Sequence, residues 1–309
     1  SSDLIFRIMK FNTKTIHGGQ KIDPAFNSVM QPIYQTSTYA QKSPGVNKGF
    51  EYSRTHNPTR TALQNSFASL ENAKYGVAFS SGLAAIDAII KLLSPGDEVI
   101  STNDLYGGTF RLFTKVFEKF SIKFHFVGME NINHIESCIN SKTKLIWVET
   151  PTNPMLNIID IKAVSNIAKK HNILLSVDNT FATPIVQRPI TLGIDIVIHS
   201  ATKYFGGHSD ITAGAVASSK SIIDKLWHLS KDFGGSLSDF SVWMLERSMK
   251  TLSIRVKAQQ KNAKKLAVFL DSHKAIKKVY YPGLESHEDH ALAKTQMKGF
   301  GAIDRKSTR

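Results

Sequence analysis

A lysine that follows an apolar run is the residue of this chain best placed for chemistry. Lys203 comes after Asp195-Ile196-Val197-Ile198-His199 and beside two hydroxyl-bearing residues, Ser200 and Thr202. The β-branched run predicts a buried strand, and open α/β sheets collect ligands at the carboxyl ends of such strands. A lysine that is partly desolvated there loses some preference for the ammonium form, so its amine could form a Schiff base with an aldehyde. Because a lysine just past a strand is more often only solvated, the neighbouring motifs decide.

Three further features lie at predicted strand ends. Ser80-Ser81-Gly82-Leu83 joins a strand to an amphipathic helix, where free N–H groups and the helix dipole could hold a phosphate. Asp178 ends an apolar run, and a carboxylate is what a pyridine nitrogen needs to stay protonated. Tyr106, before Gly107 and Gly108, could stack on a flat ring. The ordinary alternatives are a helix cap, a turn former and a Tyr-Gly turn.

Together the four features match one cofactor. A helix start for a phosphate, an acid for a ring nitrogen, a stacking aromatic side chain and a Schiff-base lysine are the contacts that pyridoxal 5′-phosphate (PLP) requires. The phosphate turn matches neither GxGxxG nor a Walker loop, so it does not indicate a nucleotide. We therefore predict a PLP site at the carboxyl ends of the strands, and no metal site.

The elements that position these residues alternate between strands and helices. Apolar runs of strand length fall at 75–80, 98–101, 124–127, 144–149, 173–178, 194–199 and 213–218. Segments of helical period fall at 83–93, 109–120, 132–140 and 161–171. This alternation predicts an α/β fold whose mostly parallel sheet is covered by helices on both faces.

The two ends of the chain differ from this core. Residues 1–55 are rich in Gln, Thr, Tyr and Pro and predict an extended arm that docks on a partner subunit. Met9 fits a true start, with residues 1–8 as an upstream extension. From about residue 220 the pattern is helical, up to a turn at Tyr280-Tyr281-Pro282-Gly283. We predict an N-terminal arm over 1–55, a PLP-binding domain over 56–254 and an incomplete α+β domain over 255–309.

The composition is that of an ordinary soluble protein, 41% hydrophobic and 21% charged over 309 residues. The formal net charge of +14 raises the question of nucleic acid. The lysines are scattered along predicted helices without a nucleic-acid-binding motif, so we favour a solvated basic surface and no nucleic-acid partner. A basic nucleic-acid-binding protein with a degenerate cofactor site is the non-enzyme alternative. A single cysteine, Cys138, and the lack of any run near the roughly 20 apolar residues of a membrane span predict a cytoplasmic protein.

Four longer runs resemble the signatures of one enzyme family. They are EYSRTHNPTR at 51–60, ETPTNP at 149–154, VDNTF at 177–181 and HSATKY at 199–204. The chain resembles, from about Thr15 to Gly301, the Cys/Met-metabolism PLP enzymes, which include cystathionine γ-lyase, γ-synthase and β-lyase and methionine γ-lyase. The resemblance implies the fold-type I, aminotransferase-like architecture and a homotetramer built from active dimers.

The resemblance also implies roles for individual residues. Lys203 corresponds to the lysine that bonds the cofactor and shuttles protons, Asp178 to the partner of the pyridine nitrogen, and Tyr106 to the stacking tyrosine. Asn153 lies where the family contacts the ring hydroxyl and the substrate carboxylate. The remaining cofactor positions, with the last two reaching over from the neighbouring subunit, are Ser81, Gly82, Leu83, Thr180, Ser200, Thr202, Tyr52 and Arg54.

The choice among family members depends on fewer residues. After Tyr106 and Gly107 the chain lacks the cysteine that methionine γ-lyases tend to carry. Glu51 resembles the acidic residue of γ-lyases and could hold the distal ammonium of cystathionine, or it is an exposed glutamate with no such role. We predict cystathionine γ-lyase, which yields cysteine, 2-oxobutanoate and ammonia. Cystathionine γ-synthase, which joins an O-acylated homoserine to cysteine, is the alternative.

Two stretches depart from the family pattern. After Gly301 a polar run replaces the expected apolar strand, and residues 304–309 resemble a translated sequencing adapter. We expect a truncated chain that lacks the arginine for the substrate carboxylate and that folds poorly or is inactive, although the intact gene product is an enzyme. Glu246 and Ser248 stand where relatives usually have an apolar residue and a glycine, and a buried charge there is costly unless it is paired.

Overall fold

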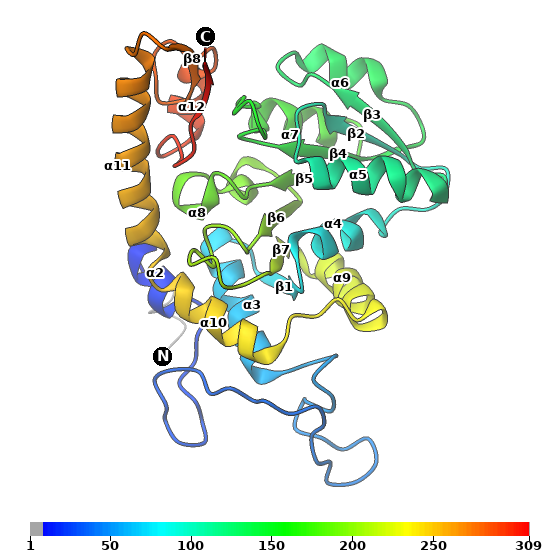
Figure 1. Cartoon of the computed structure of the whole chain (residues 1–309). Helices are drawn as coiled ribbons and strands as arrows, with labels where there is room; N and C mark the ends of the chain where they lie inside the picture. The colour runs from blue at the N-terminus through cyan, green and yellow to red at the C-terminus, as the bar shows by residue number, and fades with distance from the viewer. Residues whose placement is uncertain (1–8, 309) are drawn as a thin grey trace. The chain divides into compact units, whose positions relative to one another are not determined.

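The computed structural model describes residues 9–308, so the predicted upstream extension, residues 1–8, and Arg309 lie outside the described residues. The chain forms two compact units (Figure 1). The first consists of Ser1–Leu92 and His199–Leu252, and the second of Leu93–Ile198 and Ser253–Arg309. Strand β6 (Ile196–Ser200) therefore begins in the second unit and ends in the first.

In the first unit an antiparallel pair of strands is packed against helices. Strand β1 (Tyr75–Phe79) pairs with β7 (Gly214–Ser218). The helices are α2 (Phe11–His17), α3 (Pro58–Glu71), α4 (Gly82–Ile90), α9 (Lys220–Phe233) and α10 (Asp239–Met249). Helix α3 begins where the Asn57 side chain accepts the Thr59 N–H with proline in the first turn, and it ends at Asn72 in the left-handed conformation.

The second unit contains the parallel strands that position much of the predicted site. Strand β2 (Glu98–Thr102) pairs with β3 (Lys123–Val127) and β4 (Thr143–Glu149), β4 pairs with β5 (Leu174–Asp178), and β5 pairs with β6, all in parallel. The connecting helices are α5 (Gly107–Lys115), α6 (Ile132–Cys138), α7 (Ile161–Lys170) and α8 (Thr183–Val186), with 3-10 turns η1 (Phe117–Phe120) and η2 (Pro189–Leu192).

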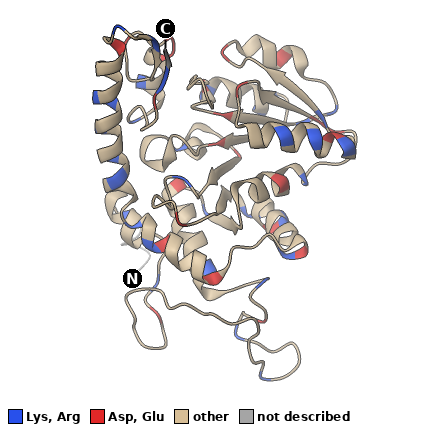
Figure 2. Ribbon diagram, in the orientation of Figure 1, with Lys and Arg blue, Asp and Glu red and all other residues tan. Residues whose placement is uncertain are grey.

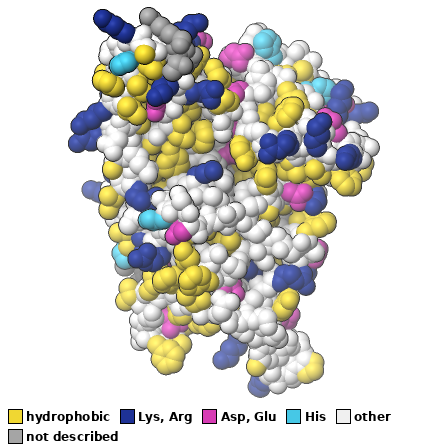
Figure 3. Space-filling view, viewed as in Figure 1, with side chains coloured by type: hydrophobic (Ala, Val, Ile, Leu, Met, Phe, Trp, Pro, Cys, Tyr) yellow, Lys and Arg dark blue, Asp and Glu magenta, His cyan; other side chains and the backbone are white. Residues whose placement is uncertain are grey.

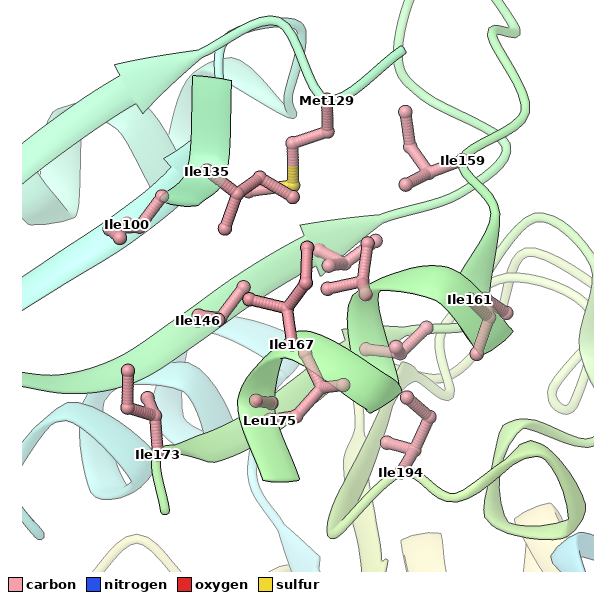
Figure 4. Close-up of a cluster of buried hydrophobic side chains, with 14 of the residues drawn as sticks. Ile100, Met129, Ile135, Ile146, Ile159, Ile161, Ile167, Ile173, Leu175 and Ile194 are labelled. Atoms are coloured by element: carbon pink, nitrogen blue, oxygen red, sulfur yellow. The ribbon is translucent and has the colours of Figure 1, made fainter. Parts of the chain in front are cut away.

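A cluster of aliphatic side chains forms the core of the second unit (Figure 4). Ile100, Ile146 and Leu175 come from strands β2, β4 and β5, and Ile135 and Ile167 come from helices α6 and α7. Because each of these β-branched or leucine side chains is removed from water, the cluster supplies the main free energy that holds the helices on the sheet. Cys138 is half-buried and packs at the edge of this cluster.

The strands form one seven-stranded sheet in the order β1-β7-β6-β5-β4-β2-β3. The pairings from β3 to β6 are parallel, and the pairing of β1 with β7 is antiparallel. The predicted α/β class with a mostly parallel sheet is therefore confirmed.

The last part of the second unit has its own small sheet and core. Its elements are α11 (Leu252–Asp271), β8 (Ile276–Tyr280), α12 (His290–Gln296) and β9 (Arg305–Thr308). Tyr281, in the predicted turn, is buried with Ala267 and Leu284. The polar run after Gly301 forms β9 and pairs antiparallel with β8. The hydrogen bonds between paired strands join backbone groups, so they form with polar side chains as well as with apolar ones. An edge strand such as β9 also tolerates polar residues.

The N-terminal segment is mostly irregular but contains one helix that the sequence did not predict, α2. Between residues 19 and 57 the regular pairing is limited to isolated bridges such as Thr38 with Tyr52. Phe26 and Val29 are 91% and 83% exposed. Aliphatic and aromatic side chains that the chain itself does not bury are typical of a segment that docks elsewhere. The predicted division into arm, PLP-binding domain and incomplete domain stays a prediction.

Lysine and arginine are spread along the helices of both units, as predicted (Figure 2). On the face shown in Figure 3 they are interleaved with hydrophobic and uncharged side chains. Within residues 9–308, no helix has the length and apolar character needed to cross a bilayer.

Glu246 is a buried acid of the first unit. It lies on α10, is 1% exposed, and neither carboxyl oxygen has a hydrogen-bond partner among the described residues. Arg247 is exposed and does not pair with it, while the Lys250 amine donates to the Ile16 carbonyl and the Gln20 side chain. Burial therefore raises the pKa of Glu246 to about 7, and the charge of Lys250 offsets only part of this.

Candidate active site

The predicted phosphate turn lies at the start of α4 in the first unit. Ser81 caps the helix, because its hydroxyl accepts the Ala84 N–H at 3.0 Å. The N–H groups of Gly82 and Leu83 belong to the first turn, where an α-helix offers no internal acceptor, so they and the helix dipole favour an anion. A Cβ added at Gly82 would lie 2.9 Å from the Cβ of Ser200. The turn is therefore packed directly against the end of β6, and glycine is needed for that approach.

A second close approach fixes the same turn from β7. A Cβ added at Gly214 would lie 2.1 Å from the Ser81 carbonyl oxygen, a distance that no real side chain tolerates. The first residue of β7 thus lies against the backbone of the helix cap. The two glycines leave the first-turn N–H groups of α4 beside Ser200, which is a suitable geometry for holding a phosphate group.

Lys203 lies in a compact turn that follows β6. Its backbone N–H donates to the Ser200 carbonyl at 3.1 Å, and its carbonyl accepts the Gly207 N–H at 2.7 Å. The Thr202 hydroxyl exchanges hydrogen bonds with the Ala213 backbone, at 3.0 Å to the N–H and 3.3 Å to the carbonyl. Thr202 thus holds the turn. The Lys203 side chain is exposed, so the partial desolvation expected for it is not supplied by the described residues of this chain.

A buried acid–imidazole pair supports the strand that leads to this turn. His199 Nε2 lies 2.5 Å from Glu71 Oε1, and the two side chains are 1% and 0% exposed. The rings of Phe67 and Phe205 lie edge-on to the imidazole, with centroids 5.5 and 4.9 Å away. The pair ties the last residue of α3 to the residue before Ser200. Sequence reasoning missed this pair because its members are 128 positions apart.

The residues predicted to reach a neighbouring subunit are exposed in this chain. The Arg54 guanidinium lies 5.3 Å from the centre of the Tyr52 ring and donates to the Lys231 carbonyl. The Glu51 carboxylate accepts the Asn47 side-chain N–H at 2.5 Å. The contacts of these residues are made within the N-terminal segment and with α9, so their predicted cofactor and substrate roles stay predictions.

The predicted partner of a pyridine nitrogen lies at the end of β5 in the second unit. Asp178 is 8% exposed, and its Oδ1 accepts the Thr180 N–H at 3.0 Å and the Thr180 hydroxyl at 2.5 Å. Hydrogen bonds to the charged form favour a carboxylate over the acid. Asp178 is therefore an oriented carboxylate at the carboxyl end of a central parallel strand, and Thr180 is the residue that orients it.

Tyr106 is the residue directly before α5, and its backbone is held by Glu149, an acid of the run 149–154 to which sequence reasoning gave no role. Its backbone N–H donates to Glu149 Oε2 at 3.0 Å. A Cβ added at Gly108 would lie 2.3 Å from Cε1 of the tyrosine, so the ring rests on the first turn of α5 where only glycine leaves room. The Tyr106 side chain is 46% exposed and can present its face to a flat ligand.

Asn153 lies in a loop that is fastened to the segment before Tyr106. Asp104 Oδ2 accepts the Thr152 hydroxyl at 2.5 Å and the Met155 N–H at 3.0 Å. Asn153 itself is half-buried between these two donors. The loop that carries the predicted ring-hydroxyl contact is thus fixed to the loop that carries the predicted stacking ring.

Each unit brings part of the predicted set together, and each part fits a part of PLP. The donors of the first unit, which are the first-turn N–H groups of the nine-residue helix α4 and the neighbouring hydroxyls, fit a phosphate dianion. The second unit offers an oriented carboxylate and an exposed aromatic ring, which fit a protonated pyridine. The members of the first set are Ser81, Gly82, Leu83, Ser200, Thr202 and Lys203, and those of the second are Tyr106, Asn153, Asp178 and Thr180.

Comparison with known families decides the class of protein. A family described as Cys/Met metabolism PLP-dependent enzyme matches residues 12–304. The chain belongs to this family. It is therefore a PLP-dependent enzyme, which confirms the predicted family, cofactor and enzymatic nature and favours them over the nucleic-acid-binding alternative.

Individual members of the Cys/Met-metabolism family are similar over nearly the whole chain. A cystathionine β-lyase of Coxiella burnetii is 48% identical over 94% of this chain and 76% of its own length. A cystathionine γ-lyase of Bacillus subtilis is 49% identical over 96% of this chain and 78% of its own length. The crystal structure of a cystathionine γ-lyase from Lactobacillus plantarum complexed with L-serine superposes with a TM-score of 0.95 at 44% identity, covering 97% of this chain and 79% of that one.

The names of these family members differ in the reaction they describe. Relatives of similar identity are named cystathionine β-lyase, γ-lyase and γ-synthase. The chain is thus a PLP-dependent trans-sulfuration enzyme of the cystathionine lyase and synthase family. The reaction within that class has to be argued from individual residues.

Proposed function

We propose that the chain is a cystathionine γ-lyase, which cleaves the Cγ–S bond of cystathionine and, with one water, gives cysteine, 2-oxobutanoate and ammonia. The observation that carries the choice is Glu51, an exposed carboxylate directly before Tyr52 in the segment predicted to reach the phosphate. Its oxygen accepts a hydrogen bond from the Asn47 side chain, which orients the carboxylate. An exposed, oriented carboxylate suits the ammonium group at the far end of cystathionine.

The first unit supplies the anchor and the base in this proposal. The first-turn N–H groups of α4 and the Ser200 hydroxyl bind the phosphate, while Thr202 holds the turn through Ala213. The Lys203 amine accepts the proton from the substrate Cα and returns it later in turnover. Exposure of this side chain in the single chain leaves it free to reach both the cofactor aldehyde and the substrate.

The second unit supplies the electrostatic partner of the ring. When bound, PLP serves as a sink for the electron pair released at the substrate Cα. Asp178, oriented by Thr180, keeps the ring nitrogen protonated, and the Tyr106 ring stacks on the ring face. Asn153 contacts the ring hydroxyl and the substrate carboxylate.

The product of cystathionine cleavage tests this choice directly. Cleavage on the four-carbon side gives 2-oxobutanoate and cysteine, whereas cleavage on the three-carbon side gives pyruvate and homocysteine. The protein reconstituted with PLP is expected to release 2-oxobutanoate, identified by mass spectrometry. If only pyruvate is released, the γ-lyase proposal is wrong and the chain is a β-lyase. If the protein forms cystathionine from an O-acylated homoserine and cysteine but releases no 2-oxobutanoate from cystathionine, the proposal is wrong and the γ-synthase alternative is right.

A matched pair of variants tests the role of Glu51. Glu51→Gln is expected to raise the KM for cystathionine about tenfold, because one charge-assisted contact is lost. The KM for a substrate that lacks a distal ammonium is expected to stay unchanged. Glu130→Gln changes another exposed glutamate of the chain and serves as the control. Equal effects of Glu51→Gln on both substrates would remove Glu51 from the substrate site.

The assembly is the second part of the proposal. Exposed Tyr52 and Arg54 are proposed to complete the phosphate site of a neighbouring copy within a homotetramer. Co-expression of Arg54→Ala with Lys203→Ala tests this. If Arg54 acts in trans, a mixed dimer has one site with both residues intact and regains activity that neither variant has alone. If the mixture stays as inactive as the parents, Arg54 acts within its own chain, and an Arg54→Ala variant that is active alone would give Arg54 no role.

A further inference from the structure

Three carboxyl groups gather at the carboxyl ends of neighbouring strands in the second unit. Asp104 follows β2, Glu149 ends β4 and Asp178 ends β5. Glu149 and Asp178 are direct partners in the parallel pairing of β4 with β5. Paired residues of adjacent strands lie about 5 Å apart and point to the same face, so these two acids are close neighbours. Three negative charges at neighbouring strand ends, two of them on the buried residues Glu149 and Asp178, would repel one another strongly.

The hydrogen bonds are distributed unequally over these three groups. Asp178 accepts a backbone N–H and a hydroxyl from Thr180, and Asp104 accepts a hydroxyl and a backbone N–H from the segment 152–155. For Glu149 the structure gives a single donor, the Tyr106 N–H at 3.0 Å. Glu149 is also 5% exposed, so water replaces few of the missing donors. Of the three, Glu149 is the least able to carry a charge.

The electrostatic surroundings of Glu149 act in the same direction. Burial raises its pKa most, and the charges of Asp178 on β5 and Asp104 after β2 raise it further. The Tyr106 N–H at the start of α5 opposes them only in part, and no lysine or arginine is among the groups that act on it. When acids share one site, the proton stays on the member with the poorest surroundings and the others remain ionised.

We propose that Glu149 is a positioning residue that works as a neutral carboxylic acid. Its carbonyl oxygen accepts the Tyr106 N–H and so fixes the start of α5, where the tyrosine ring rests on Gly108. Its proton removes one of the charges at the strand ends, so that Asp178 keeps its own charge for the ring nitrogen. The inference rests on the proposed function in that Tyr106 and Asp178 are given cofactor contacts.

The protonation of Glu149 can be read directly on the protein without cofactor. The infrared difference spectrum of wild type minus Glu149→Gln, recorded above the ordinary pKa of 4.5 and near neutral pH, is expected to contain the C=O stretch of a carboxylic acid. The matched control is Glu98→Gln, which removes another buried glutamate of the same unit. Hydrogen bonds from Asn140 and His125 lower the pKa of Glu98, so its difference spectrum is expected to contain only carboxylate bands. Carboxylate bands alone for Glu149→Gln would overturn the proposal.

A stability profile provides a second reading on the same apo-protein. Because the pKa of Glu149 is raised, its stabilising proton is present at low pH and is lost as the pH rises through the raised value. The urea midpoint of the wild type is therefore expected to fall, relative to Glu149→Gln, which cannot ionise, as the pH rises from the ordinary value of 4.5 through the raised value. A difference between the two midpoints that does not change with pH contradicts a neutral Glu149.

The positioning of Tyr106 is tested with the holoenzyme. Glu149→Leu removes the acceptor of the Tyr106 N–H as well as the proton, whereas Glu149→Gln keeps an acceptor oxygen. We expect kcat/KM of Glu149→Leu to be at least about tenfold below that of Glu149→Gln, the effect of one hydrogen bond. Equal losses would show that the contact to Tyr106 does not matter. A wild type that binds no PLP overturns the proposed function, whereas the infrared band tests Glu149 independently of that result.

Discussion

Glu246 allows the strongest test of the energetics of this fold. Its carboxyl is 1% exposed, its oxygens have no hydrogen-bond partner among the described residues, and burial raises its pKa from 4.5 to about 7. A raised pKa means that the folded chain binds the proton more tightly than the unfolded chain does. The resulting stabilisation is complete below about pH 4.5 and is lost as the pH rises through about 7. The gap between the two pKa values corresponds to about 3 kcal/mol.

Glu246→Gln separates this titration from the rest of the protein. Relative to the variant, the free energy of unfolding of the wild type is expected to fall by about 3 kcal/mol between pH values of about 4.5 and about 8. Glu246→Leu also removes both unpaired oxygens, so it is expected to be more stable than the wild type at the higher pH. Urea unfolding followed by circular dichroism at several pH values measures both effects.

The control for this experiment is Glu285→Gln, which changes an exposed glutamate of the same chain. Its free energy of unfolding is expected to follow the wild type across the pH range, because this variant keeps the buried Glu246. The reasoning is refuted if Glu246→Gln follows the wild type in the same way. That result would mean that water or a cation reaches the buried carboxylate.

Three further changes test the proposed site. Lys203→Ala is expected to abolish the adduct that borohydride traps between chain and cofactor and to lower kcat at least about a hundredfold; an adduct at the wild-type level would contradict the proposal. Gly82→Ala places a methyl group 2.9 Å from the Cβ of Ser200, so the affinity for PLP, measured by fluorescence titration, is expected to fall at least about tenfold. Unaltered affinity would show that the turn can adjust. Thr180→Val removes a hydroxyl donor from Asp178 and is expected to lower the free energy of unfolding of the apo-protein by about 1–3 kcal/mol in urea; wild-type stability would show that the hydroxyl is replaceable.

The sheet was predictable because its central strands are buried on both faces. Strands β4 and β5 were predicted within one residue of their ends, since continuous apolar runs leave little choice of structure. Helix α3 was not predicted, although Asn57 and Pro58 are a typical helix start. Its buried residues include Thr59, Arg60 and Glu71, so polar residues on the inner side hide the apolar period. The segment predicted as one helix, 109–120, is divided in the structure: α5 ends at Lys115, and the 3-10 turn η1 follows it.

Some residues of the candidate site could be predicted from short sequence motifs, whereas others depend on contacts between distant positions of the chain. Asp178, Tyr106 and the start of α4 could be found because each ends a strand or begins a helix within a short motif. Glu149 could not, because its contact with Tyr106 spans 43 positions and arises only when β4 lies beside the loop after β2. The exposure of Lys203 also lies beyond sequence reasoning, since a turn can present its side chain inward or outward.

The crowding at Gly82 and Gly214 bears on how this enzyme could be engineered. Any side chain at position 214 would collide with the carbonyl oxygen of Ser81, the residue that caps α4. Random mutation of these glycines would therefore give mostly inactive variants. Glu51 has an exposed side chain and can be exchanged without such a collision. A directed-evolution library for unnatural thioether substrates should therefore keep the two glycines constant and randomise positions whose side chains are exposed.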